Sequence, residues 1–164
     1  MRWILIQAAV LASLPWVGVW AWRMERRAVR GGRPLSPAEL AMARGCGVGC
    51  PERVRVLVVD EIPFPGFRWM QRLAARWNFD GSQTIGMALR YGIYVRGDAC
   101  GEPGLLAHEC VHTGQAERCG GLTGFLRRYL ADCLLSGYSA SSFEEEARRL
   151  AWRHGMDGDG AALS

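Results

Sequence analysis

Two histidines and a glutamate lie within five consecutive positions, His108-Glu109-Cys110-Val111-His112. Residues four apart on a helix share one face, so both imidazoles could bind one Zn²⁺ if this segment is helical. The side chain of Glu109 is rotated by about 100° from that of His108, which lets its carboxylate reach water at the metal. The metal would lower the pKa of that water towards about 7, and the carboxylate would pass its proton to a leaving amine. The segment therefore predicts zinc-dependent hydrolysis.

A catalytic zinc site has three protein ligands and one open position, so this motif needs a third ligand from elsewhere in the chain. His154 is the remaining histidine, but it ends the last predicted helix, where it would complement the helix dipole. The acidic run 144–146 begins the same helix, and its first turn could present one carboxylate inward. The dipole also favours acidic residues there without any function, so the residues alone leave the choice among the three open.

Three helices are predicted around the motif, from apolar residues that recur every three or four positions. The motif helix spans 105–115, and a second helix spans 123–135. A third helix begins at Ser142, whose side chain could cap it while Glu145 completes a capping box, and it ends near His154. These helices must position the zinc ligands.

The residues before the motif predict a small sheet. Segment 53–60 predicts a strand because it is rich in valine and its apolar residues alternate at first. Two prolines follow this segment and prevent the strand from continuing. Segment 83–96 predicts a second strand or a hairpin. A short helix is expected over 37–45, with Pro37 at its first position after Ser36, and one or two helical turns over 68–77. Sheet and helices together predict an α+β domain.

The N-terminus contains 20 consecutive residues without a charge, from Trp3 to Trp22. A helix of that length spans a bilayer core of about 30 Å. Arginines follow this run while only Arg2 precedes it, which favours an uncleaved single-pass anchor in the inner (cytoplasmic) membrane with the domain on the cytoplasmic side. The alternative is a cleaved signal peptide and a secreted or periplasmic protein.

Composition narrows the classes of function further. A chain of 164 residues that is 49% hydrophobic and 22% charged fits one small folded domain. Its net charge of +4 comes from scattered arginines without an aromatic-interleaved basic tract, so we expect no nucleic-acid partner. Several of the six cysteines lie in apolar helical segments, which favours buried thiols over a disulfide framework. Cys110 in particular should be buried and inert. Cys46 and Cys50 indicate a Gly-rich turn, since no second pair at zinc-finger spacing follows.

The sequence HECVHTGQ followed by FEEEAR resembles the gluzincin group of zinc metallopeptidases, in which a Glu from a later helix, often within E-x-x-A-D, completes the zinc site. Residues 85–150 more closely resemble small bacterial proteins with an HELVHxxQ helix, an FLxxYL helix and a GYxxxPxExEA ending. This resemblance implies a minimal zincin-like fold with Glu144 as the third ligand and Glu146 as the fallback.

The same resemblance directs attention to further residues. Arg148 stands where the gluzincin pattern has Asp, so Asp132 or Asp98 would have to support the ligands. Gln115 lies on the ligand face of the motif helix, where its amide could orient a ligand or a substrate, or simply end the helix. Tyr138 matches the Tyr of the GY pattern and could stabilise an oxyanion or pack against the helix pair.

The sequence as a whole predicts an α+β zincin-like domain over 35–154, preceded by a membrane anchor and basic linker over 1–34 and followed by a disordered tail over 155–164. The predicted activity is a membrane-anchored zinc metallopeptidase that acts on a peptide or protein substrate, with Glu109 as general base. The alternative is a non-catalytic metal-binding scaffold at the membrane.

Overall fold

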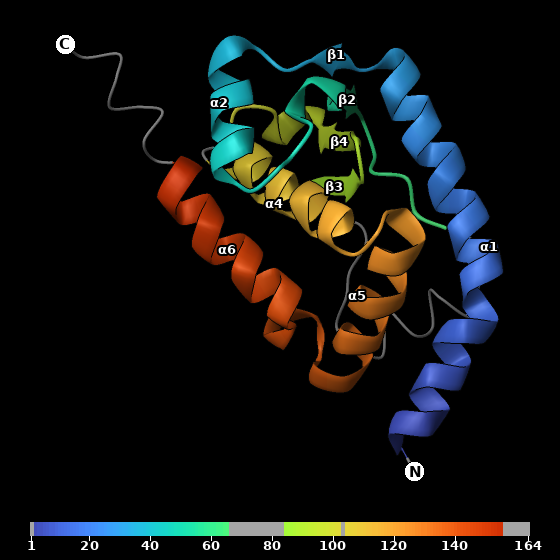
Figure 1. The fold of residues 1–164 in the computed structure, drawn as a ribbon. Helices are drawn as coiled ribbons and strands as arrows, with labels where there is room; N and C mark the ends of the chain where they lie inside the picture. The colour runs from blue at the N-terminus through green and yellow to red at the C-terminus, as the bar shows by residue number, and fades with distance from the viewer. Residues whose placement is uncertain (1, 66–83, 103, 156–164) are drawn as a thin grey trace.

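The computed structural model of the protein describes residues 2–65, 84–102 and 104–155. The helical turns predicted over 68–77 lie outside these residues, as does the tail beyond 155. Five α-helices and a four-stranded sheet form the described part, which confirms the α+β class (Figure 1).

The sheet has the strand order β1-β2-β4-β3 and is mixed. Its strands are β1 (Arg33–Pro34), β2 (Arg55–Val59), β3 (Gly86–Leu89) and β4 (Gly92–Arg96). β2 runs parallel to β4, while β1 and β3 are antiparallel to their neighbours. The predicted strand over 53–60 is therefore confirmed as β2, and β3 and β4 form a hairpin within the second predicted segment. Arg90, in its turn, has a left-handed backbone with φ of 56°.

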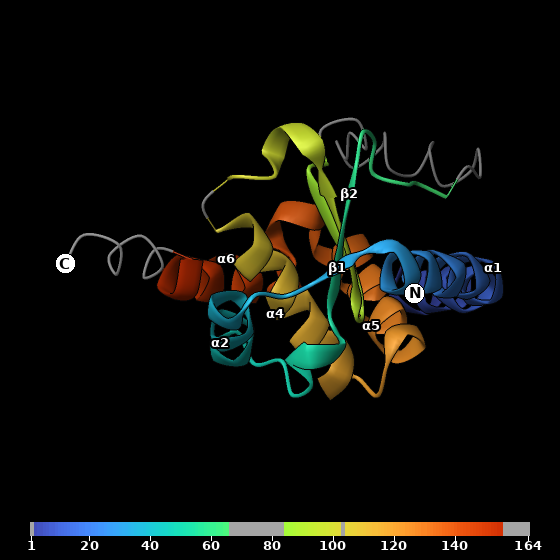
Figure 2. The ribbon, with the colours of Figure 1, turned by 90° about the horizontal axis from the view of Figure 1, so that it is seen from above.

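Helices cover both faces of the sheet (Figure 2). Residues alternate along each strand, so Ile93 and Val95 pack on one side of β4 while Tyr94 packs on the other. The first side carries α2 (Pro37–Gly45), α4 (Leu105–Arg118) and α6 (Ser142–Gly155). The second side carries α1 (Arg2–Gly31) and α5 (Leu122–Ser136). Short 3-10 turns at Pro51–Arg53, Gly97–Ala99 and Tyr138–Ala140 connect these elements.

Helix α2 begins with the signals present in its sequence. The Ser36 hydroxyl accepts a hydrogen bond from the Glu39 amide, and the Glu39 carboxylate accepts one from the Ser36 amide, so the two form a capping box. Arg33 donates two hydrogen bonds of 2.7 and 2.8 Å to the same carboxylate. This arginine, more than any other group, lowers the pKa of Glu39 to about 2.

The start of α6 differs from the prediction. Ser142 was expected to cap this helix together with Glu145, but Ser142 lies inside it and donates its own hydroxyl to Asp132 of α5, at 2.9 Å. The same carboxylate oxygen also accepts the Ser142 amide at 2.7 Å and the Ser141 hydroxyl at 2.8 Å. A carboxylate from another helix therefore replaces the local cap, because it satisfies several free donors at once.

Helix α1 packs along the second face of the sheet and along α5 (Figure 1). Its buried residues Val17, Ala21 and Ala28 contact a cluster that includes Tyr94 and Leu126. None of the described helices meets the length and hydropathy required to cross a membrane. The domain boundaries and the cytoplasmic orientation stay predictions.

All six cysteines lie in the described residues, and all are free thiols. Cys46 and Cys110 are fully buried in the core between α2, α4 and the sheet, as expected for a small hydrophobic side chain. Burial raises the pKa of the Cys46 thiol to about 11. Residues 46–50 form a turn after α2, which agrees with the interpretation of the Gly-rich segment.

Candidate metal site

The two histidines of the motif lie one turn apart on α4 and point to a common place. Their Nε2 atoms are 3.1 Å apart, and the two rings meet edge to face with centroids 4.8 Å apart. His112 is buried, whereas 21% of the His108 side chain is exposed. The site is therefore reachable from solvent on the His108 side.

Glu144 of α6 brings its carboxylate to the same place. One oxygen lies 3.4 Å from His108 Nε2, and the other lies 3.3 Å from His112 Nε2. The candidate ligand atoms of all three residues lie within 4.8 Å of one another, so the group could hold a metal ion. Glu144 is only 1% exposed, which makes a bare negative charge there expensive without a cation.

Gln115 determines which nitrogen of His112 faces the site. Its amide nitrogen donates to the Phe143 carbonyl oxygen at 2.9 Å and to Glu146 Oε2 at 2.8 Å, and both of these partners can only accept. The amide oxygen of Gln115 therefore faces His112 Nδ1, at 2.8 Å, and this nitrogen must carry the proton. In the neutral ring, Nε2 then presents a lone pair to the site, the tautomer that a metal requires.

The electrostatics of the site favour a cation. Burial alone would lower the pKa of His112, but the carboxylates of Glu144 and Glu109 together with the Gln115 amide oxygen outweigh it, so that pKa is raised. Burial would likewise raise the pKa of Glu144, yet hydrogen bonds from His108, His112 and Tyr129 hold it well below its usual range. The carboxylate therefore stays ionised, and the field that favours a proton on His112 also favours a metal ion.

Aromatic residues of α5 and α6 enclose the buried side of the site. Tyr129 donates its hydroxyl to Glu144 Oε1 at 2.6 Å, and Phe125 and Phe143 pack around its ring. Burial raises the pKa of Tyr129 well above its usual value, so this hydroxyl remains a donor. The sequence prediction missed Tyr129, although its spacing of four from Phe125 placed it on the core stripe of this helix.

Glu109 lies beside the three ligand candidates and not among them. Its buried side chain packs between α4 and the edge strand β3, where the Ala88 amide donates to it. Burial raises the pKa of Glu109, and the two motif histidines partly oppose that rise. The carboxylate fits because residue 86 is glycine, for a Cβ there would lie 2.5 Å from Glu109 Oε1. The proposed general base is therefore almost fully shielded from bulk water.

Two other candidate ligands lie elsewhere. Glu146 forms an ion pair with Arg118 at 2.8 Å and accepts the Gln115 amide, so it supports Gln115. His154 lies against the end of α2, where a Cβ on Gly45 would be 2.9 Å from its Nδ1. Neither belongs to the group that could hold a metal.

Arg148, the two aspartates proposed as support for the ligands, and Tyr138 have separate roles. Arg148 donates to the Ser139 carbonyl oxygen at 2.7 Å, and Asp98 forms an exposed ion pair with Arg96 at 2.6 Å. Asp132 acts through the start of α6, the helix that carries Glu144. Tyr138 lies close enough to Glu144 for the carboxylate charge to add to the rise in its pKa that burial causes, although 36% of this tyrosine is exposed.

Comparison with known proteins identified no relative: no family model, no curated protein and no solved structure matches this chain.

Proposed function

We propose that the protein is a zinc-dependent peptidase with His108, His112 and Glu144 as metal ligands. The observation that carries the proposal is the convergence of two imidazoles and an ionised, buried carboxylate, with Gln115 holding the His112 tautomer that binds metal. Two histidines and one glutamate form a donor set typical of catalytic zinc, and they leave a coordination position open.

Each residue has a distinct task in the proposed reaction. When bound, zinc would supply a Lewis acid that polarises a peptide carbonyl and acidifies water. Glu109, with a pKa raised by burial, is suited to take a proton from water and to return it to the leaving amine. Tyr129 keeps Glu144 ionised and in place. The exposed edge of His108 is the side from which a substrate would approach.

The second candidate is a metal-binding domain without turnover. The deep burial of His112 and Glu144, together with the Tyr129 hydroxyl on that carboxylate, favours this alternative, because structural metal sites are closed to solvent. Both candidates require the same ligands and differ in the need for Glu109.

The first test concerns the metal. Elemental analysis of protein purified without chelators should find about one zinc per chain. Both His112→Ala and Glu144→Gln should lose it, with affinity falling by more than the roughly hundredfold that loss of a supporting residue costs. Glu145→Gln is the matched control for Glu144→Gln, because Glu145 is exposed on the same helical turn. Zinc-free wild-type protein would refute both candidates.

The second test concerns turnover. Zinc-loaded wild-type protein should cleave members of a broad peptide library, and Glu109→Gln should retain zinc but lose cleavage. Cleavage at the wild-type rate in Glu109→Gln would remove catalysis by this site from the proposal. Zinc binding without any cleavage by the wild type would favour the metal-binding domain.

A further inference from the structure

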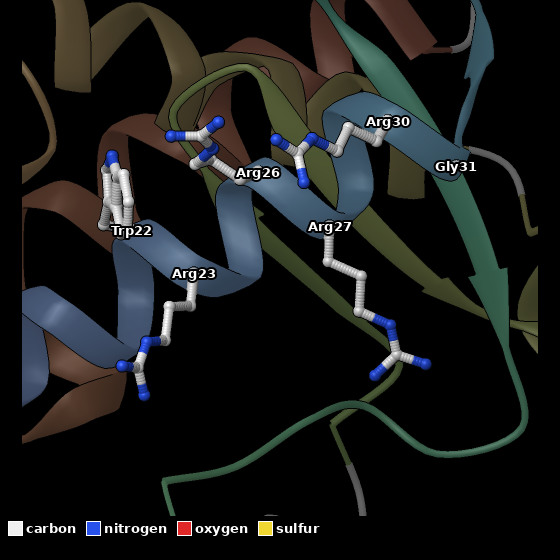
Figure 3. A pocket seen from close by; sticks show the side chains of 6 residues that line it. All are labelled: Trp22, Arg23, Arg26, Arg27, Arg30 and Gly31. Atoms are coloured by element: carbon white, nitrogen blue, oxygen red, sulfur yellow. The ribbon is translucent and has the colours of Figure 1, made fainter.

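Helix α1 has an outer face that differs from the rest of the surface. Four arginines, Arg23, Arg26, Arg27 and Arg30, lie within eight residues and line a shallow groove of about 540 Å³ together with Trp22 and Gly31. We call these four residues the arginine patch. Figure 3 shows their guanidinium groups spreading away from the helix backbone. All four are exposed, and among the described residues no carboxylate forms an ion pair with any of them.

Large apolar side chains share this face. Trp16, Val19 and Trp22 are 68%, 50% and 49% exposed. At about 100° per residue, these three and the arginine patch fall within an arc of roughly 140° around the helix. The guanidinium of Arg26 lies over the Trp22 ring, 4.8 Å from its centroid, so the two kinds of residue are in contact.

The opposite arc of α1 is already occupied by protein. Val17, Ala21 and Ala28 are at most 3% exposed because they pack on α5 and on the sheet. The helix is thus fixed to the domain through one face and presents the other as a rigid surface. This surface lies on the opposite side of the sheet from α6, which carries Glu144 (Figure 2).

We propose that this outer face of α1 binds the surface of an anionic lipid bilayer. Guanidinium groups bind phosphate oxygens through paired hydrogen bonds, and a cluster of them is attracted to a negative membrane surface. Tryptophan rings favour the headgroup level of a bilayer. The charge-free run 3–22, which ends where the patch begins, is compatible with the apolar boundary below the headgroups. The exposed tryptophans favour a bilayer over a nucleic acid, which the arginines alone would also attract. The helix would lie on the bilayer, because its inner face stays packed on the domain.

The test measures sedimentation of the full-length protein with vesicles. The protein should bind vesicles of phosphatidylcholine mixed in equal parts with phosphatidylglycerol, and not vesicles of phosphatidylcholine alone. Binding should weaken as salt is added, since salt screens the arginine charges. Fluorescence of the exposed tryptophans should shift to shorter wavelength in the bound state.

Two charge variants decide whether the patch is responsible. Replacing its four arginines with glutamine should weaken binding by roughly a hundredfold or more, as expected for four basic groups near an anionic surface. The matched control removes the same charge from four exposed arginines on other elements, Arg44, Arg127, Arg149 and Arg153. Circular dichroism checks that both variants keep the wild-type fold.

Three results would overturn the inference. In the first, the patch variant and the control lose equal affinity, which would make the attraction a matter of net charge alone. In the second, alkaline carbonate fails to release the protein from the vesicles, as expected for a helix that spans the bilayer. In the third, the protein binds duplex DNA through the patch but does not bind anionic vesicles.

Discussion

A substitution at Gly86 would displace the proposed general base without touching a proposed metal ligand. This residue begins β3, and Glu109 packs directly against it. A Cβ at this position would lie 2.5 Å from Glu109 Oε1, 3.0 Å from its Cδ and 3.0 Å from Leu105 Cδ1. Both neighbours are the flexible ends of side chains, so Gly86→Ala should fold while forcing the carboxylate to move.

The size of the movement follows from these contacts. Ordinary contact with a Cβ begins at 3.4 Å, so the carboxylate oxygen must retreat by about 0.9 Å, the difference between 3.4 and 2.5 Å. A displacement of about 1 Å in a catalytic group costs on the order of a hundredfold in rate. We therefore expect kcat/KM of Gly86→Ala for a cleaved peptide to fall by about a hundredfold, while zinc affinity stays at the wild-type value.

The assay combines peptide cleavage with zinc titration against a competing chelator. Gly101→Ala is the matched control, because a Cβ at Gly101 meets nothing within 4 Å. If Gly86→Ala cleaves peptide at the wild-type rate, the position of Glu109 against β3 does not matter for the reaction. If Gly86→Ala loses zinc instead, the substitution also displaces the proposed ligands, which contradicts the expectation that it moves Glu109 alone.

Three further perturbations test the surroundings of the site. Gln115→Leu removes the acceptor for His112 Nδ1, and chelator competition should show zinc affinity lower by about ten- to a hundredfold. Tyr129→Phe removes the donor to Glu144 and should weaken zinc in that assay while leaving a folded protein; unchanged affinity in either variant contradicts its supporting role. Asp132→Ala should lower the free energy of unfolding by about 1–2 kcal/mol, measured with urea at neutral pH. Burial opposes ionisation of Asp132, but hydrogen bonds from the start of α6 lower its pKa below 3.8. The difference from wild type should therefore shrink as the pH falls below 3.8, and a constant difference would contradict this assignment.

Much of the local structure was predictable because it depends on neighbours in sequence. The capping box at Ser36 and Glu39, the Val-rich strand β2 and the pairing of His108 with His112 each follow from spacings of two to four residues. A helix places residues four apart on one face wherever it packs in the fold. The two histidines of the site could therefore be identified without any knowledge of the sheet.

The partners of those histidines depend on distant segments. Glu144 and Glu146 differ by about 200° around α6, so only the packing of α6 on α4 decides which of them faces the imidazoles. That packing turns Glu144 to the site and Glu146 to Arg118 and Gln115. The resemblance to gluzincins favoured Glu144, but no local pattern separated the two.

The sequence by itself determined a helix with two histidines on one face, a strand followed by a second strand or hairpin before it in the chain, and an acidic helix start downstream. Only the tertiary structure decided that Tyr129 holds Glu144, that Asp132 caps α6 and that α1 packs on the sheet through one face. The physical reason is that backbone periodicity is local, whereas the rotation of each helix is determined by side chains it meets from remote parts of the chain.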